Sequence, residues 1–233
     1  EDMGATNPLR FCDEYINTQT KGEPGQVLKF KLELSEGNIN SFGFFGVDGQ
    51  KITVKDKNEN VIWSRSLAGK EESSSWWQYF FGTKFINRND AWFLGEADYD
   101  TSVSIEIEPA GNKAVAIGHL VIGKKIFLGD TAAKPKVSIS DYSREITNDW
   151  GVTKLRKGAT AKYCVIEVVV PTSEVDFVEK TLARTAGELN LFIASERENG
   201  FECLAVFGFF RDHELIIANS QTSSLNINLK GVI

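Results

Sequence analysis

The chain has 233 residues, of which 42% are hydrophobic and 11% aromatic. This length fits one large domain or two medium ones, and the apolar share excludes an intrinsically disordered chain. The formal net charge is -6, with Lys and Arg scattered along the sequence. We therefore expect no nucleic-acid partner, because binding a phosphate backbone requires a clustered basic surface.

Cysteine and histidine are too few to predict a metal or cofactor site. The three cysteines are Cys12, Cys164 and Cys203. Because Cys164 and Cys203 lie in apolar runs, we predict reduced buried thiols there rather than a disulfide. No run reaches the roughly 18 apolar residues of a membrane span, and the first residues lack a signal-peptide pattern. We expect a protein made in a cytoplasm, with no cofactor and no membrane insertion.

The N-terminal half alternates between apolar and polar residues in short runs. After a polar arm at residues 1–25, strict alternation from Val27 predicts a half-buried strand. Asp48-Gly49 predicts a hairpin between the runs 42–47 and 51–55. Further short strands are predicted at 61–65, 101–108, 114–122 and 126–128. Regularly spaced strands without a helix pattern predict a jelly-roll-like β-sandwich over residues 26–130.

The C-terminal half, residues 131–233, combines strands with one helix. Residues 164–170 form a β-branched apolar run that ends at Pro171, and a strand is predicted there. Ser173 with Asp176 resembles a helix capping box, and Gly187 is placed to end the helix. Further strands are predicted at 136–139, 189–194, 203–210, 213–218 and 224–230, with a hairpin-like excursion over 141–162. The pattern predicts an α+β module, one helix on a mostly antiparallel sheet, within a mainly β protein.

A cluster of aromatic residues in the first half has two interpretations. Aromatic rings stack well on sugars, so the cluster is a candidate glycan-binding platform. Its members are Trp76, Trp77, Tyr79, Trp92 and Tyr99. In a strand, however, Trp76 and Trp77 point to opposite faces, so one set must be core or subunit interface. We regard packing as the stronger interpretation and keep glycan binding as the alternative.

Neighbouring acids invite an enzymatic interpretation. Asp98, Asp100, Glu106 and Glu108 are close in sequence, and a retaining glycosidase needs two carboxyl groups roughly 5 Å apart. Glu106 and Glu108 alternate with isoleucines, however, so a solvated strand face explains them more simply. Calcium binding at the acidic loops is likewise weaker than turn chemistry. We predict no catalytic residue and no metal site.

The segment Asp141-Tyr142-Ser143-Arg144 is the strongest candidate for a specific contact. An Arg and an Asp just after a domain boundary suit an ion pair between domains or between subunits. A local turn clamp explains the same residues equally well. Ser143 has neither a glycine-elbow context nor a partner His, so it is not a nucleophile.

Several segments resemble a family of tailed-bacteriophage tail proteins. They are Ser138-Ile139-Ser140-Asp141-Tyr142-Ser143-Arg144, then Asn148-Asp149-Trp150-Gly151, Val168-Val169-Val170-Pro171-Thr172, and Val206-Phe207-Gly208-Phe209-Phe210-Arg211-Asp212. The family pattern usually has a basic residue after the position of Arg144, where this chain has Glu145. The resemblance implies a virion component of the tail tip or baseplate, synthesised in the bacterial host cytoplasm. In that setting the candidate interface residues are Asp141, Tyr142, Arg144, Trp150 and Arg211.

The sequence therefore predicts a structural protein rather than an enzyme. The C-terminal module packs with copies of itself into a ring at the tail end and contacts other phage tail proteins. The sandwich projects outward, where it either binds a host cell-surface glycan or braces neighbouring proteins. The alternative is a carbohydrate-binding adhesin without a ring role, and a glycoside hydrolase is the rival with least in its favour.

Overall fold

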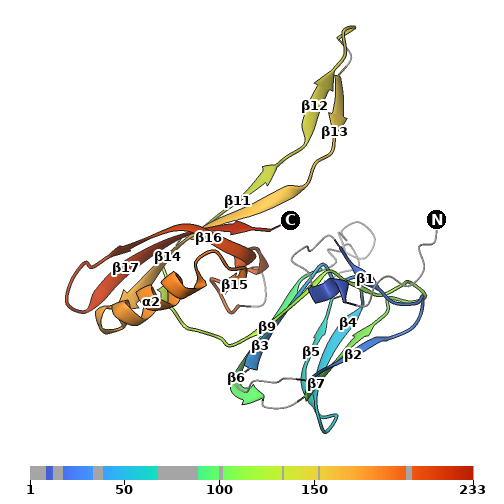
Figure 1. Cartoon of the computed structure of the whole chain (residues 1–233), viewed down its shortest axis with the longest axis horizontal. Helices are drawn as coiled ribbons and strands as arrows, with labels where there is room; N and C mark the ends of the chain where they lie inside the picture. The colour runs from blue at the N-terminus through green and yellow to red at the C-terminus, as the bar shows by residue number, and fades with distance from the viewer. Residues whose placement is uncertain are drawn as a thin grey trace, which may run out of the picture. The chain divides into compact units, whose positions relative to one another are not determined.

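The computed structural model describes residues 9–12, 18–33, 39–67, 89–99, 102–132, 134–151, 153–197 and 201–232. The chain divides into two compact units, Glu1–Lys125 and Ile126–Ile233 (Figure 1). The division falls five residues before the boundary expected from the sequence. Both units are built of antiparallel sheets, and the described residues include a single α-helix, which confirms the mainly β class.

Unit 1 contains two main sheets and a short two-stranded one. One sheet has the strand order β2-β7-β4-β5, the other β6-β3-β9, and β1 pairs with β8. The strands are β1 (Thr20–Lys21), β2 (Leu28–Glu33), β3 (Ile39–Phe45), β4 (Lys51–Asp56), β5 (Val61–Ser66), β6 (Ala91–Tyr99), β7 (Ser102–Glu108), β8 (Ala116–Ile117) and β9 (His119–Gly123). A one-turn 3-10 helix, Arg10–Cys12, precedes them.

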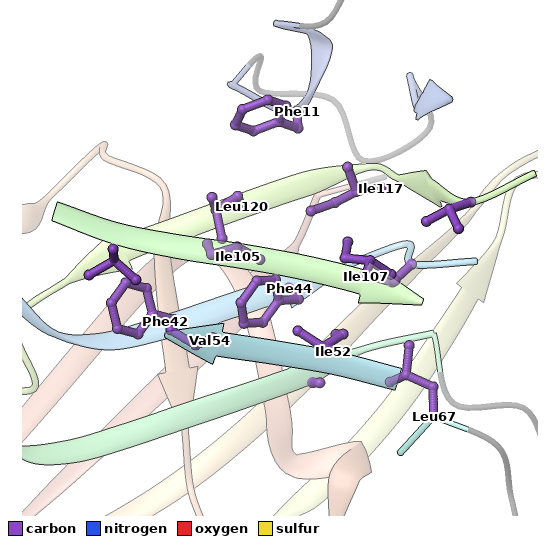
Figure 2. Close-up of a cluster of buried hydrophobic side chains, with 14 residues drawn as sticks. Phe11, Phe42, Phe44, Ile52, Val54, Leu67, Ile105, Ile107, Ile117 and Leu120 are labelled. Carbon is purple, nitrogen blue, oxygen red and sulfur yellow. The ribbon is translucent and has the colours of Figure 1, made fainter. Parts of the chain in front are cut away.

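The core of unit 1 lies between its two main sheets. Every second residue of β7 is fully buried, and these are Val103, Ile105 and Ile107. They gather with Phe42 and Phe44 of β3 in one cluster (Figure 2). This is the period-two alternation that the sequence predicted, with the alternate polar residues on the outer face. The β-sandwich prediction for the first half is confirmed.

Two local predictions for the first half of the sequence are wrong. Asp48-Gly49 does not close a hairpin, because β3 and β4 belong to different sheets. Instead Asp48 bridges to Ala116, and the chain crosses from one sheet to the other at this point. Residues 126–128 do not form a strand. The strands predicted at 27–34, 61–65, 101–108 and 114–122 are present, with small shifts at their ends.

Unit 2 is one six-stranded sheet, a helix and a separate hairpin. The strand order is β10-β14-β17-β16-β15, and β11 also pairs with β14. The strands are β10 (Asp130–Thr131), β11 (Lys136–Asp141), β12 (Arg144–Thr147), β13 (Thr153–Arg156), β14 (Thr160–Pro171), β15 (Asn190–Ile193), β16 (Ala205–Ile216) and β17 (Thr222–Gly231). The helix α2 spans Val175–Thr185, and 3-10 turns occupy Thr172–Glu174 and Glu202–Leu204.

Helix α2 covers one face of this sheet. Val175, Val178 and Leu182 are buried at helical spacing and cluster with the buried residues of β14 and β17. The predicted capping box is wrong, since a 3-10 turn precedes α2 and no side chain caps the helix. Gly187 has the left-handed conformation expected after a helix, with φ +82°.

Strand β16 is longer than predicted. The runs 203–210 and 213–218 were expected to be separate strands, but Ala205–Ile216 is continuous and pairs with β17 along most of its length. The register shifts between Phe210 and Asp212, which places Arg211 at a β-bulge. Because of this bulge, β16 continues past Arg211, where the sequence pattern predicts the end of one strand and the start of another.

Candidate functional site

A two-stranded hairpin leaves the sheet of unit 2 between β11 and β14, and we call it the arm (Figure 1). It consists of β12, β13 and the tip residues 148–151, and it corresponds to the excursion predicted at 141–162. All eight residues of β12 and β13 are exposed. Among them Leu155 is 76% exposed and Ile146 53%, while Trp150 at the tip is 90% exposed. The arm therefore presents apolar side chains that nothing in the described part of the chain covers.

Hydrogen bonds hold the root of the arm. The backbone N–H and hydroxyl of Ser143 both donate to the Asp141 carboxylate, at 2.8 and 2.6 Å. These bonds lower the pKa of Asp141, because they favour its charged form. The Ser143 hydroxyl in turn accepts the N–H of Gly158 at 3.0 Å. Asp141 and Ser143 thus form the local turn clamp that the sequence analysis left open.

Gly158 allows the two strands to cross closely at this root. A Cβ atom added to Gly158 would lie 2.4 Å from the backbone of Tyr142, far inside van der Waals contact. The N–H of Tyr142 donates to the carbonyl of Ala159 at 3.0 Å, so the two chain segments remain paired through the crossing. The arm is joined to the sheet by a defined connection rather than by a loose linker.

Two tyrosines and two cations lie beside the root. The hydroxyls of Tyr142 and Tyr163 are 3.2 Å apart. The Lys230 ammonium lies 5.8 Å from the centre of the Tyr163 ring. The hydrogen bond from Tyr142, with the positive charges of Lys230 and Arg211, lowers the pKa of Tyr163. The structure therefore brings Tyr142 and Arg211, both candidate interface residues, to the same end of the sheet.

Strand register sorts the arm residues onto two faces. Arg144 lies opposite Arg156, and Ile146 opposite Lys154, so these four share one face. The other face carries Glu145, Leu155, Thr147 and Thr153, and the two threonine hydroxyls are 3.0 Å apart. We call the first the basic face of the arm. Two arginines directly opposite each other repel, so this arrangement disfavours the arm as an isolated hairpin.

Within its own unit, no salt bridge joins Arg144 to another described residue, and Asp141 accepts the two hydrogen bonds of Ser143 instead. The ion pair between domains or subunits that the sequence suggests stays a prediction. Arg144 lies on the basic face and Trp150 lies at the arm tip, away from the root. The five candidate interface residues thus divide into a root group, namely Asp141, Tyr142 and Arg211, and two that lie farther out.

The sheet face opposite α2 is the second exposed surface of unit 2. Register places three cross-strand rows of β14, β17 and β16 on it: Val165, Asn228 and Asp212; Glu167, Asn226 and Glu214; Val169, Ser224 and Ile216. Val165 is 41% exposed and Ile216 45% exposed. Ser224 donates to Glu167 at 3.1 Å and Asn228 to Asp212 at 2.9 Å, which confirms that these side chains share a face. We call these rows the open face.

Of the five candidate glycan-binding residues, only Trp92 has a described side chain, and it is buried. Trp76, Trp77 and Tyr79 lie outside the described residues, and so does the side chain of Tyr99 at the end of β6. Trp92 is only 5% exposed, and the Arg65 guanidinium lies 5.5 Å from the centre of its ring. Its ring is therefore packed, which corrects its inclusion among stacking residues. Core packing is the interpretation that holds for Trp92.

Of the four acids considered for catalysis, Glu106 and Glu108 form ion pairs. The Glu106 carboxylate contacts Lys55 at 2.6 Å and Lys29 at 2.9 Å. These two hydrogen bonds lower the pKa of Glu106, which favours a permanent carboxylate over a proton donor at neutral pH. Glu108 pairs with Lys51 at 3.5 Å. Asp98 and Asp100 cannot be compared with them, because their side chains lie outside the described set.

No group of three or more His, Cys, Asp or Glu suited to a metal ion occurs among the described residues. All three cysteines are free: Cys164 is buried, as predicted, but Cys203 is exposed, which corrects the expectation for it. Burial raises the pKa of the Cys164 thiol. In the same described part of the chain, no helix is long and apolar enough to span a membrane.

Comparison with known proteins gives a distant structural likeness. No protein-family model matches the chain, and no curated protein matches it. Two of the solved structures that the comparison found are the lectin domain of Lectinolysin complexed with Lewis b antigen and a mutant of that domain with Lewis b. Each is 7% identical, has a TM-score of 0.37 and covers 53% of this chain. The likeness covers 87% of the mutant chain and 88% of the other.

Sequence reasoning missed the open face and Gly158. Glu167 and Glu214 lie within apolar strands, and their alternation with buried neighbours is the signal that they share one surface. The need for glycine at position 158 comes from a close backbone crossing that no local motif marks.

Proposed function

We propose that this protein is a structural subunit that assembles with copies of itself through unit 2. The observation that carries the proposal is the arm, a paired hairpin whose β12 and β13 residues are all exposed. The resemblance of the arm root and of the flanking strands to tailed-phage tail proteins gives the proposed setting, a ring at the tail tip or baseplate. The proposal assigns the protein no chemical reaction.

The physical argument concerns the cost of an uncovered hairpin. An isolated two-stranded hairpin is marginally stable in water, and exposed apolar side chains gain free energy only when something buries them. Ile146, Leu155 and Trp150 are three such side chains on one short hairpin. The hairpin is closely packed at Gly158, whereas its β12 and β13 residues are exposed, so it is suited to contact another molecule.

Measuring the mass of the purified chain across concentrations tests the proposal. We expect a discrete oligomer whose population grows with concentration in sedimentation velocity. A variant with residues 144–156 replaced by a two-residue Asn-Gly turn should remain folded by circular dichroism and sediment as a monomer. A wild-type chain that stays monomeric at every concentration, or an arm-less chain that assembles normally, contradicts the proposal.

Glycan binding by unit 1 is the second candidate function. The observation that favours it is the aromatic run at 76–81 in the sequence of a unit whose described strands form a β-sandwich. Glycan-array binding by the wild-type chain, lost in a Trp76→Ala, Trp77→Ala double variant, supports it. The buried Trp92 provides the control, since Trp92→Phe should keep any glycan binding. An array without a signal rejects this candidate and leaves the assembly proposal intact.

A further inference from the structure

The arm and the open face carry complementary chemistry. The basic face of the arm holds Arg144, Lys154 and Arg156 around one apolar residue, Ile146. The open face holds Asp212, Glu167 and Glu214 with apolar residues in the rows on either side of the two glutamates. The same face also carries Lys136, opposite Val165 at the edge, and Lys230, one row beyond Asn228, but neither lies in the row of Glu167 and Glu214. That row thus offers the anions that the basic face lacks, and both surfaces belong to the same unit.

We infer that the basic face of the arm docks on the open face of a second copy of this chain. This inference rests on the proposed function and identifies the surface that receives the arm. The arm cannot reach the open face of its own unit, because it continues the direction of β11 and β14 away from the sheet (Figure 1). An arm that docks on this face therefore comes from another molecule.

The spacing of the two surfaces supports this pairing. Rows on one strand face repeat about every 7 Å, so the Arg144–Arg156 row and the Ile146–Lys154 row are one such repeat apart. Rows on the open face have the same repeat, and Glu167 and Glu214 lie about 10 Å apart because β17 runs between them. A two-stranded arm centred on Asn226 brings one cationic row between the two glutamates. Ile146 then lies beside Val169 and Ile216, the exposed apolar residues of the next row.

Docking also relieves one unfavourable feature of the isolated chain. Arg144 and Arg156 face each other across the arm, and like charges in that position destabilise a hairpin. Glu167 and Glu214 lie in one row on either side of Asn226. Bringing the arginines against the glutamates replaces the arginine repulsion with charge-assisted hydrogen bonds, which guanidinium groups form in pairs with carboxylates.

The contact joins two different surfaces, so it permits two kinds of assembly. When each copy offers its arm to one neighbour and its open face to another, the contact is head-to-tail and its repetition gives a closed ring or an open filament, depending on the rotation between copies. When two copies exchange arms, the same contact forms twice across a two-fold axis and gives a closed dimer. The ring in the proposed function corresponds to the head-to-tail arrangement.

Charge exchange between the two surfaces tests the inference. The arm variant is Arg144→Glu with Arg156→Glu, and the face variant is Glu167→Arg with Glu214→Arg. We expect each alone to weaken self-association by roughly tenfold or more in sedimentation velocity, and an equimolar mixture of the two to restore assembly. The matched control is Lys180→Glu with Arg184→Glu on α2, which makes the same charge change and should assemble like the wild type.

The possible outcomes separate this inference from the proposed function. If the wild type assembles and neither variant weakens it, or if mixing does not rescue them, the docking surface is wrong while assembly stands. If the wild type never assembles, both fail. Co-sedimentation with vesicles of 30% phosphatidylserine distinguishes a lipid partner: binding by a monomeric wild type, lost in the arm variant, assigns the basic face to a membrane and overturns the inference. Circular dichroism of each variant excludes unfolding as the cause of lost assembly.

Discussion

The two units of this protein differ in how the faces of their sheets are covered. In unit 1 two sheets face each other, so the apolar face of each is covered by the other. In unit 2 one sheet has a single helix on one face, and the opposite face remains exposed with valine and isoleucine on it. Unit 1 completes its core internally, whereas unit 2 keeps an exposed face and an exposed arm. The contrast is the reason why the proposed self-assembly is placed in unit 2.

The largest expected effect comes from truncating the same side chain inside and outside the core of unit 2. Leu182→Ala removes a buried side chain beneath the sheet and should lower the free energy of unfolding by about 2–5 kcal/mol. Leu155→Ala in the arm should change it by less than about 0.5 kcal/mol. Urea denaturation followed by circular dichroism measures both. Equal losses contradict the division between a packed core and an exposed arm.

Gly158 tests the rigid root of the arm. Gly158→Ala forces a Cβ against the Tyr142 backbone, and we expect a loss of about 1–3 kcal/mol or a displaced arm. Hydrogen exchange should show faster exchange in β12 and β13 with β17 unchanged. The matched control is Gly123→Ala, where an added Cβ meets nothing within 4 Å. Unchanged protection of the arm in Gly158→Ala rejects a tightly joined root.

Glu106 predicts a pH effect confined to unit 1. The pKa of Glu106 in the folded protein lies below its usual value. The stabilisation by the Glu106 carboxylate is therefore fully present above the unfolded pKa of about 4.3. It is lost as the pH falls through the pKa of the folded protein. The group is partly exposed, so the effect should be about 1 kcal/mol or less. Wild type should lose more stability than Glu106→Gln between pH 7 and pH 3. An identical loss in the two proteins contradicts the ion-pair assignment.

Trp150 should show the smallest effect on folding. Because its side chain is 90% exposed, Trp150→Ala should leave the midpoint of thermal unfolding unchanged within about 1 °C. Sedimentation velocity of the same variant shows whether the contact with a neighbouring copy extends to the arm tip, because loss of the Trp150 side chain then weakens self-association. A clear drop in the unfolding midpoint instead assigns Trp150 a packing role within its own chain.

Periodicity predicted most of the elements, because burial on one face imposes it directly. The alternation in β7 and the helical spacing of Val175, Val178 and Leu182 are examples. Pairing was harder to predict: Asp48-Gly49 is a good turn in any setting, and its sequence does not say that the chain changes sheets there. The capping box failed because Ser173 lies inside the 3-10 turn Thr172–Glu174, so that Glu174 rather than Ser173 precedes α2. The first residue of that turn, Thr172, hydrogen-bonds to Asn219 and Ser223, which are distant in sequence.

The candidate interface was predicted only in part, for a similar reason. Asp141 to Arg144 stand out locally, and Trp150 is conspicuous at a turn. The open face, by contrast, combines Glu167 with Glu214, which are distant in sequence and meet only through the register of β14, β17 and β16. Residues that share a surface through strand pairing carry no sequence motif.

Site-specific cross-linking tests the central claim most directly. Starting from a chain with Cys12→Ser and Cys203→Ser, one preparation carries Ile146→Cys on the basic face and another carries Ser224→Cys, between Val169 and Ile216 in the row that the docked arm places beside Ile146. Mild oxidation of the mixture should give a disulfide between positions 146 and 224 of different molecules, identified by mass spectrometry. Thr147→Cys, on the opposite face of the arm, should give little. Absence of the 146–224 product, or equal cross-linking from position 147, contradicts the docking of the arm on a neighbouring copy.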